Sequence, residues 1–289
     1  MTSKITVAAV QMDVELSQPA RNLDRIIESL RDTARRGALV TVYPEASLTG
    51  YCFETAEEAR ALAETIPGPS TLRLAEACRA TKAFAVLGLI ESDGARIFNA
   101  CALVGPEGVV AKYRKVHLPF LGLDRFTEPG DQPFAVHETG PLRVGMNICY
   151  DGGFPEAARV LALEGADLIA LPTNWPPGAE TAACFLTNAR ALENNVYYMA
   201  VNRVGTERGF RFIGGSRICH PDGRTLAEAP PDRDAVIYAD VEPEVARRKH
   251  LVRVPGKHEI HRFADRRPEM YGKILDPVDR SPSPRWRKD

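Results

Sequence analysis

Residues 142–171, LRVGMNICYDGGFPEAARVLALEGADLIAL, show the strand–helix–strand pattern that indicates the fold class of this chain. The apolar run at 142–149 predicts a strand, and a proline at the first turn of the next periodic stretch predicts a helix over 155–164. Residues 167–171 predict a second, buried strand. Cys149 therefore lies at a sharp turn from strand to helix, where backbone N–H groups can hold an anion.

The same alternation of strand and helix patterns continues through most of the chain. Strands are predicted at 4–11, 38–43, 83–90, 96–104, 108–114, 196–202, 211–219 and 234–240, and helices at 20–36, 54–65, 70–81, 179–195 and 242–250. These βα units, together with two hairpins, predict an α/β fold with a mixed sheet, or two sheets, and helices outside. The sequence has no repeat and no low-complexity linker, so one domain is favoured.

The composition argues against several classes of partner. The chain has 289 residues, is 44% hydrophobic and has a formal net charge of −1, with both signs interspersed. These values indicate a sizeable core and no surface for nucleic acid or an anionic membrane. No stretch approaches the roughly 18 apolar residues of a membrane span, and the N-terminus lacks a secretory pattern. We therefore expect a cytoplasmic protein.

The six cysteines are scattered and form no CxxC pair, which predicts reduced thiols rather than a disulfide framework. Cys219 and His220 could contribute to a zinc site with another histidine. However, neighbouring side chains on a strand point to opposite faces, so we expect no metal site there.

Three chemically active residues end apolar, strand-like runs: Glu45 after ALVTVYP, Lys115 in GVVAKYRK, and Cys149 after LRVGMNI. In open α/β sheets, functional sites form at the carboxyl ends of strands. Because an isolated buried charge costs roughly several kcal/mol, we expect the three side chains to face one another. A base, a cation and a thiol in one pocket can attack a carbonyl or nitrile carbon.

Each of the three residues also has a structural alternative. Cys149 could be a buried core cysteine, Glu45 a solvated loop carboxylate, and Lys115 part of a solvated basic face. For Lys115, side-chain alternation counted from Val109 predicts an inward orientation. A Ser-His-Asp site is the competing constellation, but no GxSxG motif occurs, and the best serine, Ser216, lies in a turn-like GGS.

Seven segments, covering the chain to about residue 241, resemble the nitrilase-like carbon–nitrogen hydrolases. They are PEASLTGY (44–51), KYRKVHLP (112–119), EPGD (128–131), NICYDGGFPEAARVLALEGADLI (147–169), LPTNWP (171–176), RALENNVYYMAVNRVG (190–205) and GGSRICHPDG (214–223). The resemblance implies an αββα sandwich of two mixed sheets, with a carbon–nitrogen hydrolase domain at 1–241. It also implies a homodimer or higher homo-oligomer, in which we expect the C-terminal extension, residues 242–289, to pack on a partner subunit.

The resemblance further implies roles for single residues. Cys149 matches the nucleophile, Glu45 the general base and Lys115 the cationic stabiliser, and the backbone N–H of Tyr150 would complete the oxyanion hole.

Many family members place a further glutamate in the loop before the PGD turn. Here that loop reads LPFLGLDRFTEPGD, and it offers Asp124 or Glu128. Asp124 is favoured as the substitute, although its side chain is one methylene shorter.

The substrate class also follows from the resemblance. The tripeptide Cys-Tyr-Asp is similar to the amidase and N-carbamoyl hydrolase branches, whereas nitrilases more often show Cys-Trp-Glu. Gly152 and Gly153 stand where members that clamp an α-carboxylate often carry arginine, which leaves Arg203, Arg208 or Arg211 as possible replacements. Candidate pocket residues flank the matched segments; they are Tyr51, Phe53, Phe120, Phe126, Tyr150, Asn174 and Trp175.

We therefore expect hydrolysis of a small aliphatic linear amide or N-carbamoyl compound. The products would be an acid, or an amine plus CO2, and ammonia, formed through a thioester without metal or organic cofactor. A nitrilase is the alternative activity, and an acyl-transfer or non-catalytic family member is the remaining one.

Overall fold

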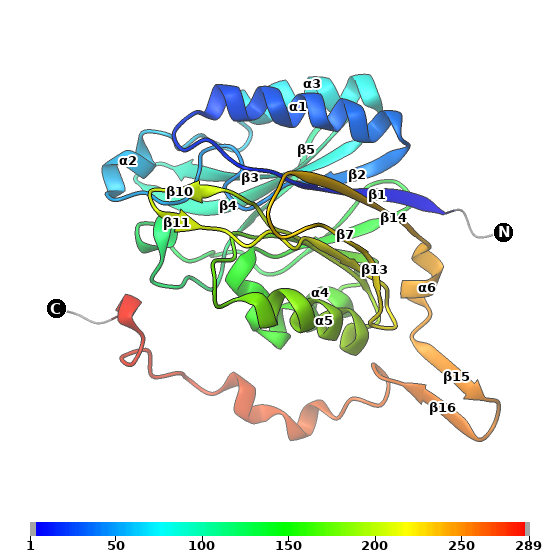
Figure 1. Cartoon of the computed structure of the whole chain (residues 1–289). Helices are drawn as coiled ribbons and strands as arrows, with labels where there is room; N and C mark the ends of the chain where they lie inside the picture. Colours follow the sequence, from blue (N-terminus) through cyan, green and yellow to red (C-terminus); the bar gives the residue numbers. More distant parts are fainter. Residues whose placement is uncertain (1–3, 287–289) are drawn as a thin grey trace.

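The computed structural model describes residues 4–286. Two six-stranded sheets lie face to face, and helices cover the outer face of each, which gives four layers (Figure 1). The first sheet has the strand order β14-β1-β2-β3-β4-β5, and the second has the order β13-β12-β9-β8-β7-β6. The αββα sandwich of two mixed sheets predicted from the sequence is confirmed.

The first sheet is parallel among its first three strands in the chain and antiparallel elsewhere. Its strands are β1 (Ile5–Gln11), β2 (Ala38–Val42), β3 (Phe84–Asp93), β4 (Arg96–Gly105), β5 (Gly108–Arg114) and β14 (Ala235–Val241). Helices α1 (Pro19–Arg35) and α3 (Pro69–Thr81) lie side by side on its outer face (Figure 1). The buried apolar residues of α1 recur at i, i+3, i+4 and i+7, as this packing requires.

The second sheet repeats this arrangement on the other side. Its strands are β6 (Val136–Glu138), β7 (Arg143–Met146), β8 (Leu168–Pro172), β9 (Tyr197–Val201), β12 (Arg217–Cys219) and β13 (Thr225–Glu228). Helices α4 (Pro155–Leu163) and α5 (Thr187–Asn194) cover its outer face. A short hairpin of β10 (Thr206–Glu207) and β11 (Phe210–Arg211) stands apart from both sheets.

The main core fills the space between the sheets. Alternate residues of each strand enter it: Val7 and Ala9 of β1 lie in this core, whereas Val10 packs in the cluster under α1 and α3. Strands that are buried on both faces need continuous apolar runs, which explains LIALP in β8 and YYMAV in β9. Because both faces are covered, a charged side chain at the end of a central strand is enclosed by the protein.

A β-bulge corrects one expectation about β5. The pairing of β4 with β5 shifts between Leu103 and Val104, so that Val109 packs toward the outer layer. Ala111 and Tyr113 face the inter-sheet core. The inward orientation predicted for Lys115 is correct, but the alternation that leads to it begins after the bulge and not at Val109.

Three helices are shorter than their sequence patterns predicted. The region 242–250 contains only α6 (Pro243–Arg247), because β15 (His250–Val254) begins at His250. The region 54–65 contains only α2 (Ala56–Arg60), since Glu64 leaves the helix to pair with β3: its backbone N–H donates to the Ile90 carbonyl at 3.0 Å. In the region 179–195, a π-helical turn at Ala182–Leu186 precedes α5. Within residues 4–286, no helix is long and apolar enough to cross a membrane.

The C-terminal segment leaves the first sheet after β14 and runs outside α4 and α5 (Figure 1). It contains α6 (Pro243–Arg247), the hairpin of β15 (His250–Val254) and β16 (His258–His261), and short 3-10 turns at Pro268–Met270, Gly272–Leu275 and Pro284–Trp286. Arg262 donates to the Leu192 carbonyl at 2.8 Å, and the Arg159 guanidinium lies over the Phe263 ring. Residues 287–289 of the predicted extension lie outside the described part.

A glycine in β3 marks a position where the fold has no room for added volume. A Cβ on Gly88 would lie 2.5 Å from both the Ala46 nitrogen and the Pro44 oxygen, which are backbone atoms. We expect Gly88→Ala to lower the free energy of unfolding by about 1–3 kcal/mol through overpacking, measured by urea denaturation. Gly272→Ala is the control, because its Cβ would meet no atom within 4 Å. Equal midpoints for both variants and wild type would contradict this expectation.

Candidate active site

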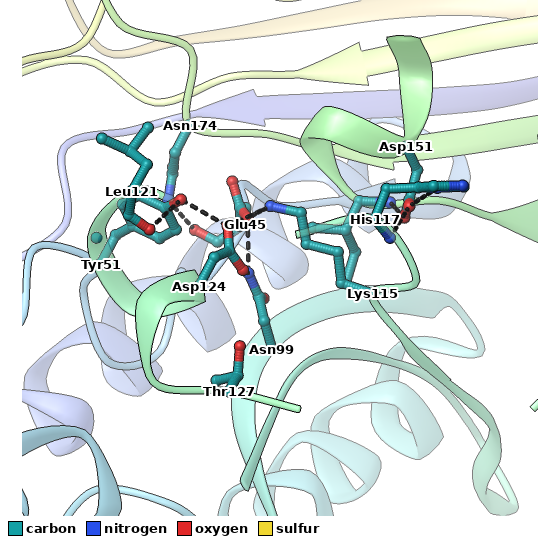
Figure 2. Close-up of polar contacts among 12 residues, drawn as sticks. Glu45, Tyr51, Asn99, Lys115, His117, Leu121, Asp124, Thr127, Asp151 and Asn174 are labelled. Carbon is teal, nitrogen blue, oxygen red and sulfur yellow. Dashed lines mark hydrogen bonds and ion pairs between the residues drawn. The ribbon is translucent and has the colours of Figure 1, made fainter. Parts of the chain in front are cut away.

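Glu45 is held by the turn that follows β2. The turn packs directly on Gly88 of β3, and Ala46 adopts a left-handed φ of 48° to continue it. The Asn174 amide, which follows β8 of the other sheet, donates to the Glu45 carbonyl at 3.0 Å. These contacts fix the backbone of Glu45, so that its side chain is buried and points into the space between the two sheet ends (Figure 2).

Lys115 bonds to two buried carboxylates at once. Its Nζ donates to Glu45 Oε1 at 2.7 Å and to Asp124 Oδ2 at 2.6 Å (Figure 2). Asn99 of β4 joins the same two carboxylates, because its Nδ2 donates to Glu45 Oε1 at 2.7 Å and to Asp124 Oδ1 at 2.8 Å. All four side chains are buried. One ammonium therefore lies between two carboxylates, shielded from bulk solvent.

Asp124 takes the place that the sequence left open between two acidic residues. It lies in the 3-10 turn Gly122–Arg125 and accepts a hydrogen bond from the Tyr51 hydroxyl at 2.7 Å. Gly122 makes this approach possible, since a Cβ there would lie 2.4 Å from the Tyr51 ring. Glu128 is exposed. The structure thus brings Asp124 to Lys115 and leaves Glu128 outside the cluster.

The cluster raises the pKa values of both Glu45 and Lys115, for different physical reasons. Burial raises the pKa of Glu45 above its usual value, and the charge of Asp124 adds to this effect while Lys115 opposes it. Burial alone would lower the pKa of Lys115, but Asp124 and Glu45 outweigh it and hold that pKa well above the usual range. Glu45 Oε2 is buried and has no hydrogen-bond partner among residues 4–286. It is therefore available to accept a proton.

Cys149 begins the 3-10 turn Cys149–Gly153, three residues after the end of β7. Its φ of 45° lies in the left-handed region, a strained conformation that is common where function requires it. Burial, and next the charge of Glu45, raise the pKa of the thiol to about 12. The opposite effect comes from the charge of Lys115 and from hydrogen bonds with the Thr173 hydroxyl and the Asn174 backbone N–H, which lower the pKa of the thiol. The thiol is therefore protonated at neutral pH, and its attack requires a base.

A carboxylate that sequence reasoning missed ties this turn to the strand of Lys115. Asp151 is buried and accepts hydrogen bonds from Tyr113 OH at 2.7 Å, Ile148 N at 3.0 Å, His117 N at 2.9 Å and His117 Nδ1 at 2.7 Å. The His117 ring also stacks on Phe154 at 3.7 Å. Tyr113 and His117 lie two residues before and after Lys115, and Asp151 lies two residues after Cys149. This spacing was the signal in the sequence that could have indicated their contact.

The predicted substrate-contacting residues fall into two groups. Tyr51 and Asn174 are buried at the cluster, and Trp175 is buried in the apolar layer that also holds Ala183. Tyr150 and Phe120 are exposed, at 47% and 60%. The remaining two aromatic candidates, Phe53 and Phe126, pack in the same apolar cluster as Tyr51, together with Leu123 and Phe212.

The structure corrects the alternative assignments for arginine and serine. Arg203 is fully buried and donates hydrogen bonds to Glu207, Asp13 and the Val14 carbonyl. It is therefore not free to clamp a substrate carboxylate. Arg208 pairs with Glu58 at 2.8 Å, and Arg211 is exposed on β11. Ser216 is buried and donates to the Gln11 side chain at 2.9 Å, which makes it a link between the sheets.

The structure also describes the pair considered for zinc. Cys219 is buried, and His220 pairs with Asp222 at 2.9 Å. Among the described residues, no group of three or more His, Cys, Asp or Glu side chains could hold a metal ion.

Removing Lys115 tests whether the cluster depends on its cation. We expect Lys115→Ala to lower the free energy of unfolding by about 3–5 kcal/mol, because two buried carboxylates would lose their counter-charge. Lys112→Ala on the same strand is the control; its partner Glu91 keeps two bonds to Arg114, at 2.7 and 2.8 Å. Urea denaturation of both variants gives the comparison. Equal losses in the two variants would show that the cluster has no special dependence on Lys115.

Comparisons with known proteins place this site in a family. A family model described as carbon–nitrogen hydrolase matches residues 6–250. A protein named nitrilase from Pyrococcus abyssi is 40% identical over 269 residues, which are 92% of this chain and 99% of the relative. An omega-amidase from Homo sapiens is 31% identical over 290 residues, covering 94% of this chain and 98% of its own.

A solved structure of an amidase from Nesterenkonia sp. superposes with a TM-score of 0.77 at 26% identity, covering 95% of this chain and 98% of that one. A structure of a mutant of the amidase from Nesterenkonia sp. AN1 has the acetamide moiety of fluoroacetamide added at its active-site cysteine, with a TM-score of 0.78 at 26% identity, covering 95% of this chain and 98% of that one. The chain therefore belongs to the carbon–nitrogen hydrolases of the nitrilase superfamily and is an enzyme of that class.

Proposed function

We propose that the protein is a cysteine-dependent hydrolase of small linear amides or N-carbamoyl compounds, with Cys149 as nucleophile, Glu45 as general base and Lys115 as cationic stabiliser. The observation that carries the proposal is the buried contact of Lys115 with Glu45 and Asp124, beside a thiol whose pKa reflects both Glu45 and Lys115. The mutant of the Nesterenkonia sp. AN1 amidase that carries the acetamide moiety of fluoroacetamide on its active-site cysteine supports the choice of nucleophile.

The acylation step follows from the charges of the three groups. Glu45 takes the thiol proton on its unpartnered Oε2 while the sulfur forms a bond to the carbonyl carbon, and the carbonyl π electrons move to oxygen. Lys115 Nζ and the backbone N–H of Tyr150 stabilise that oxyanion; the loss of one such donor typically reduces the rate by about 10²–10³. Glu45 then returns the proton to the nitrogen, the carbonyl re-forms and the C–N bond breaks. Ammonia departs, and the acyl group remains on Cys149 as a thioester.

Hydrolysis of the thioester reverses these roles. Glu45 takes a proton from water, the resulting hydroxide attacks the thioester carbon, and the C–S bond breaks as the sulfur regains the proton. Asp124 contributes by keeping Lys115 protonated throughout, since it supplies the second of the two negative charges around the ammonium. The proposed reaction uses groups of the protein chain and water only.

A nitrilase is the second candidate, because the 40% identical Pyrococcus relative bears that name. The same thiol can add to a nitrile carbon, and hydration of the adduct would give acid and ammonia. An acyl-transfer role would instead deliver the thioester to a nucleophile other than water. Ammonia, acid and retained amide are measured with an amide and its matching nitrile; release of ammonia from the nitrile alone would replace the amidase proposal.

We also propose that the enzyme is a homodimer or larger homo-oligomer in which the segment after residue 241 packs on a partner subunit. Large apolar side chains are exposed along this segment and on the helices beside it; they are Val252, Val254, Met270, Ile274, Leu275, Val278, Val160, Leu163 and Leu192. Exposed apolar patches of this kind mark protein contacts.

Light scattering of the full chain and of a chain ending at residue 241 measures the assembly; a monomeric full-length protein would contradict the proposal.

Substitution of the nucleophile tests the mechanism directly. We expect Cys149→Ala to release no ammonia from amides that the wild type hydrolyses and to keep the same circular dichroism spectrum. Cys184→Ser, which alters an exposed cysteine, should retain full activity. With the wild type, mass spectrometry of an acid-quenched reaction should find the acyl group on the peptide that contains Cys149. Substantial turnover by Cys149→Ala would remove the basis of the proposal.

The raised pKa of Glu45 predicts the acid side of the pH profile. Glu45 accepts a proton only when it is ionised, so kcat/KM should fall as the pH falls through this pKa, which lies above the usual 4.5. In Asp124→Asn, the charge that helps raise the pKa of Glu45 is absent, and the midpoint should move to lower pH. Glu128→Gln is the matched control in the same loop, and its midpoint should not move. A profile of Asp124→Asn identical to wild type would contradict this assignment.

A further inference from the structure

We propose that Glu207, in the small β10–β11 hairpin, is a positioning residue for the active site: it fixes the Tyr51 backbone and thereby the hydrogen bond from Tyr51 to Asp124. The inference rests on the proposed function, since Asp124 matters through its contact with Lys115. The sequence had suggested a substrate clamp for Arg203 in this region. The structure assigns the Arg203 side chain to an internal ion pair instead.

The Glu207 carboxylate is buried and uses both oxygens. Its Oε2 accepts the backbone N–H of Tyr51 at 2.8 Å and that of Cys52 at 2.5 Å. Its Oε1 accepts from Arg203 Nη1 at 2.7 Å. Two consecutive backbone donors on one carboxylate oxygen fix the direction of the peptide chain at Tyr51, as a charged acceptor does at a helix start.

Arg203 anchors this carboxylate to the first sheet. Its other terminal nitrogen donates to Asp13 Oδ1 at 2.9 Å and to the Val14 carbonyl at 2.8 Å, just after the end of β1. Its guanidinium also lies 4.3 Å from the centroid of the Phe212 ring. Removing one partner from such a buried pair leaves an uncompensated charge. Glu207 is therefore held in place by the body of the fold, and it can in turn hold the loop.

Two glycines are required for this close packing. Gly50 has a φ of 85°, and a Cβ there would lie 2.8 Å from Glu207 Oε1 and 2.7 Å from Leu16 Cδ1. Gly205 has a φ of 86°, and a Cβ there would lie 2.2 Å from the Asp13 carboxyl carbon. The backbone on both sides of the ion pair thus approaches it more closely than any side chain would allow.

The contacts form a continuous path to the reacting groups. Glu207 holds the Tyr51 amide, the Tyr51 hydroxyl donates to Asp124 Oδ2 at 2.7 Å, and the same oxygen accepts from Lys115 at 2.6 Å. The Tyr51 ring packs against Gly122, in the turn that carries Asp124. A displaced Tyr51 would therefore change the position of the Asp124 carboxylate, although Glu207 itself touches no reacting atom.

A double-mutant cycle tests this path. Glu207→Gln keeps the size of the side chain but removes its charge, and we expect kcat for an amide to fall about tenfold or more while KM changes less than twofold, because small misplacements of catalytic groups reduce rate steeply. Tyr51→Phe removes the hydroxyl. If Glu207 acts through Tyr51, adding Glu207→Gln to Tyr51→Phe should lower kcat by no more than a further twofold. Independent, multiplicative losses would overturn the proposal.

Further variants separate positioning from general stability. Glu207→Asp keeps the charge with a shorter reach, so it should melt close to the wild type yet share the loss of kcat. Arg208→Gln, in the same hairpin, breaks partly exposed pairs with Glu58 at 2.8 Å and Glu54 at 3.9 Å, and should leave kcat unchanged. A Glu207→Asp variant with lowered melting temperature and wild-type kcat would show a stabilising role only.

A second readout does not depend on turnover. The rate at which iodoacetamide alkylates Cys149, followed on the Cys149 peptide by mass spectrometry, reports the state of the thiol and its base. We expect Glu207→Gln to change this rate and to have no effect in the Tyr51→Phe background. If the wild type hydrolyses neither amide nor nitrile, the proposed function fails, while this labelling cycle still decides the role of Glu207; equal rates in Glu207→Gln and the wild type would overturn it.

Discussion

The site depends on one buried ammonium shared by two carboxylates. Lys115 reaches Glu45 at 2.7 Å and Asp124 at 2.6 Å, and none of the three side chains is exposed to solvent to any significant degree. None of these charges would be stable in this place alone, because desolvation of a single ion costs roughly several kcal/mol. The strand of Glu45, the strand of Lys115 and the turn of Asp124 must therefore fold together.

This arrangement also sets the chemistry. The cluster carries two negative charges and one positive charge, so burial and the excess negative charge raise the pKa values of both Glu45 and Cys149. In the proposed mechanism, ionised Glu45 takes the proton of the thiol as the sulfur attacks. Lys115 would keep its charge for the oxyanion, because its pKa is held well above the usual range.

The surrounding structure holds these groups from behind. Asp151 joins the turn of Cys149 to the residues on either side of Lys115, and Glu207 joins the loop of Tyr51 to the end of the first sheet. Both are buried carboxylates that accept backbone N–H groups, which fixes loops more rigidly than apolar packing does. Loops with such support can place side chains with the accuracy that covalent catalysis requires.

The sequence by itself determined the layered α/β class and the three residues at strand ends, Glu45, Lys115 and Cys149, because apolar periodicity and the interruption of a buried strand by a polar group are local signals. With the family resemblance, it also limited the candidates for the second acidic residue of the site to Asp124 and Glu128. Only the tertiary structure decided between them.

Only the tertiary structure, too, recruited Asn99, Asp151 and Glu207 and turned Arg203 from a possible clamp into an internal anchor. Asn99 is a polar residue inside the largely apolar strand β4, and the sequence analysis did not single it out. The physical reason is that hydrogen bonds and ion pairs join atoms that are distant in the chain, and the β-bulge in β5 and the left-handed turn at Cys149 decide which side chains meet.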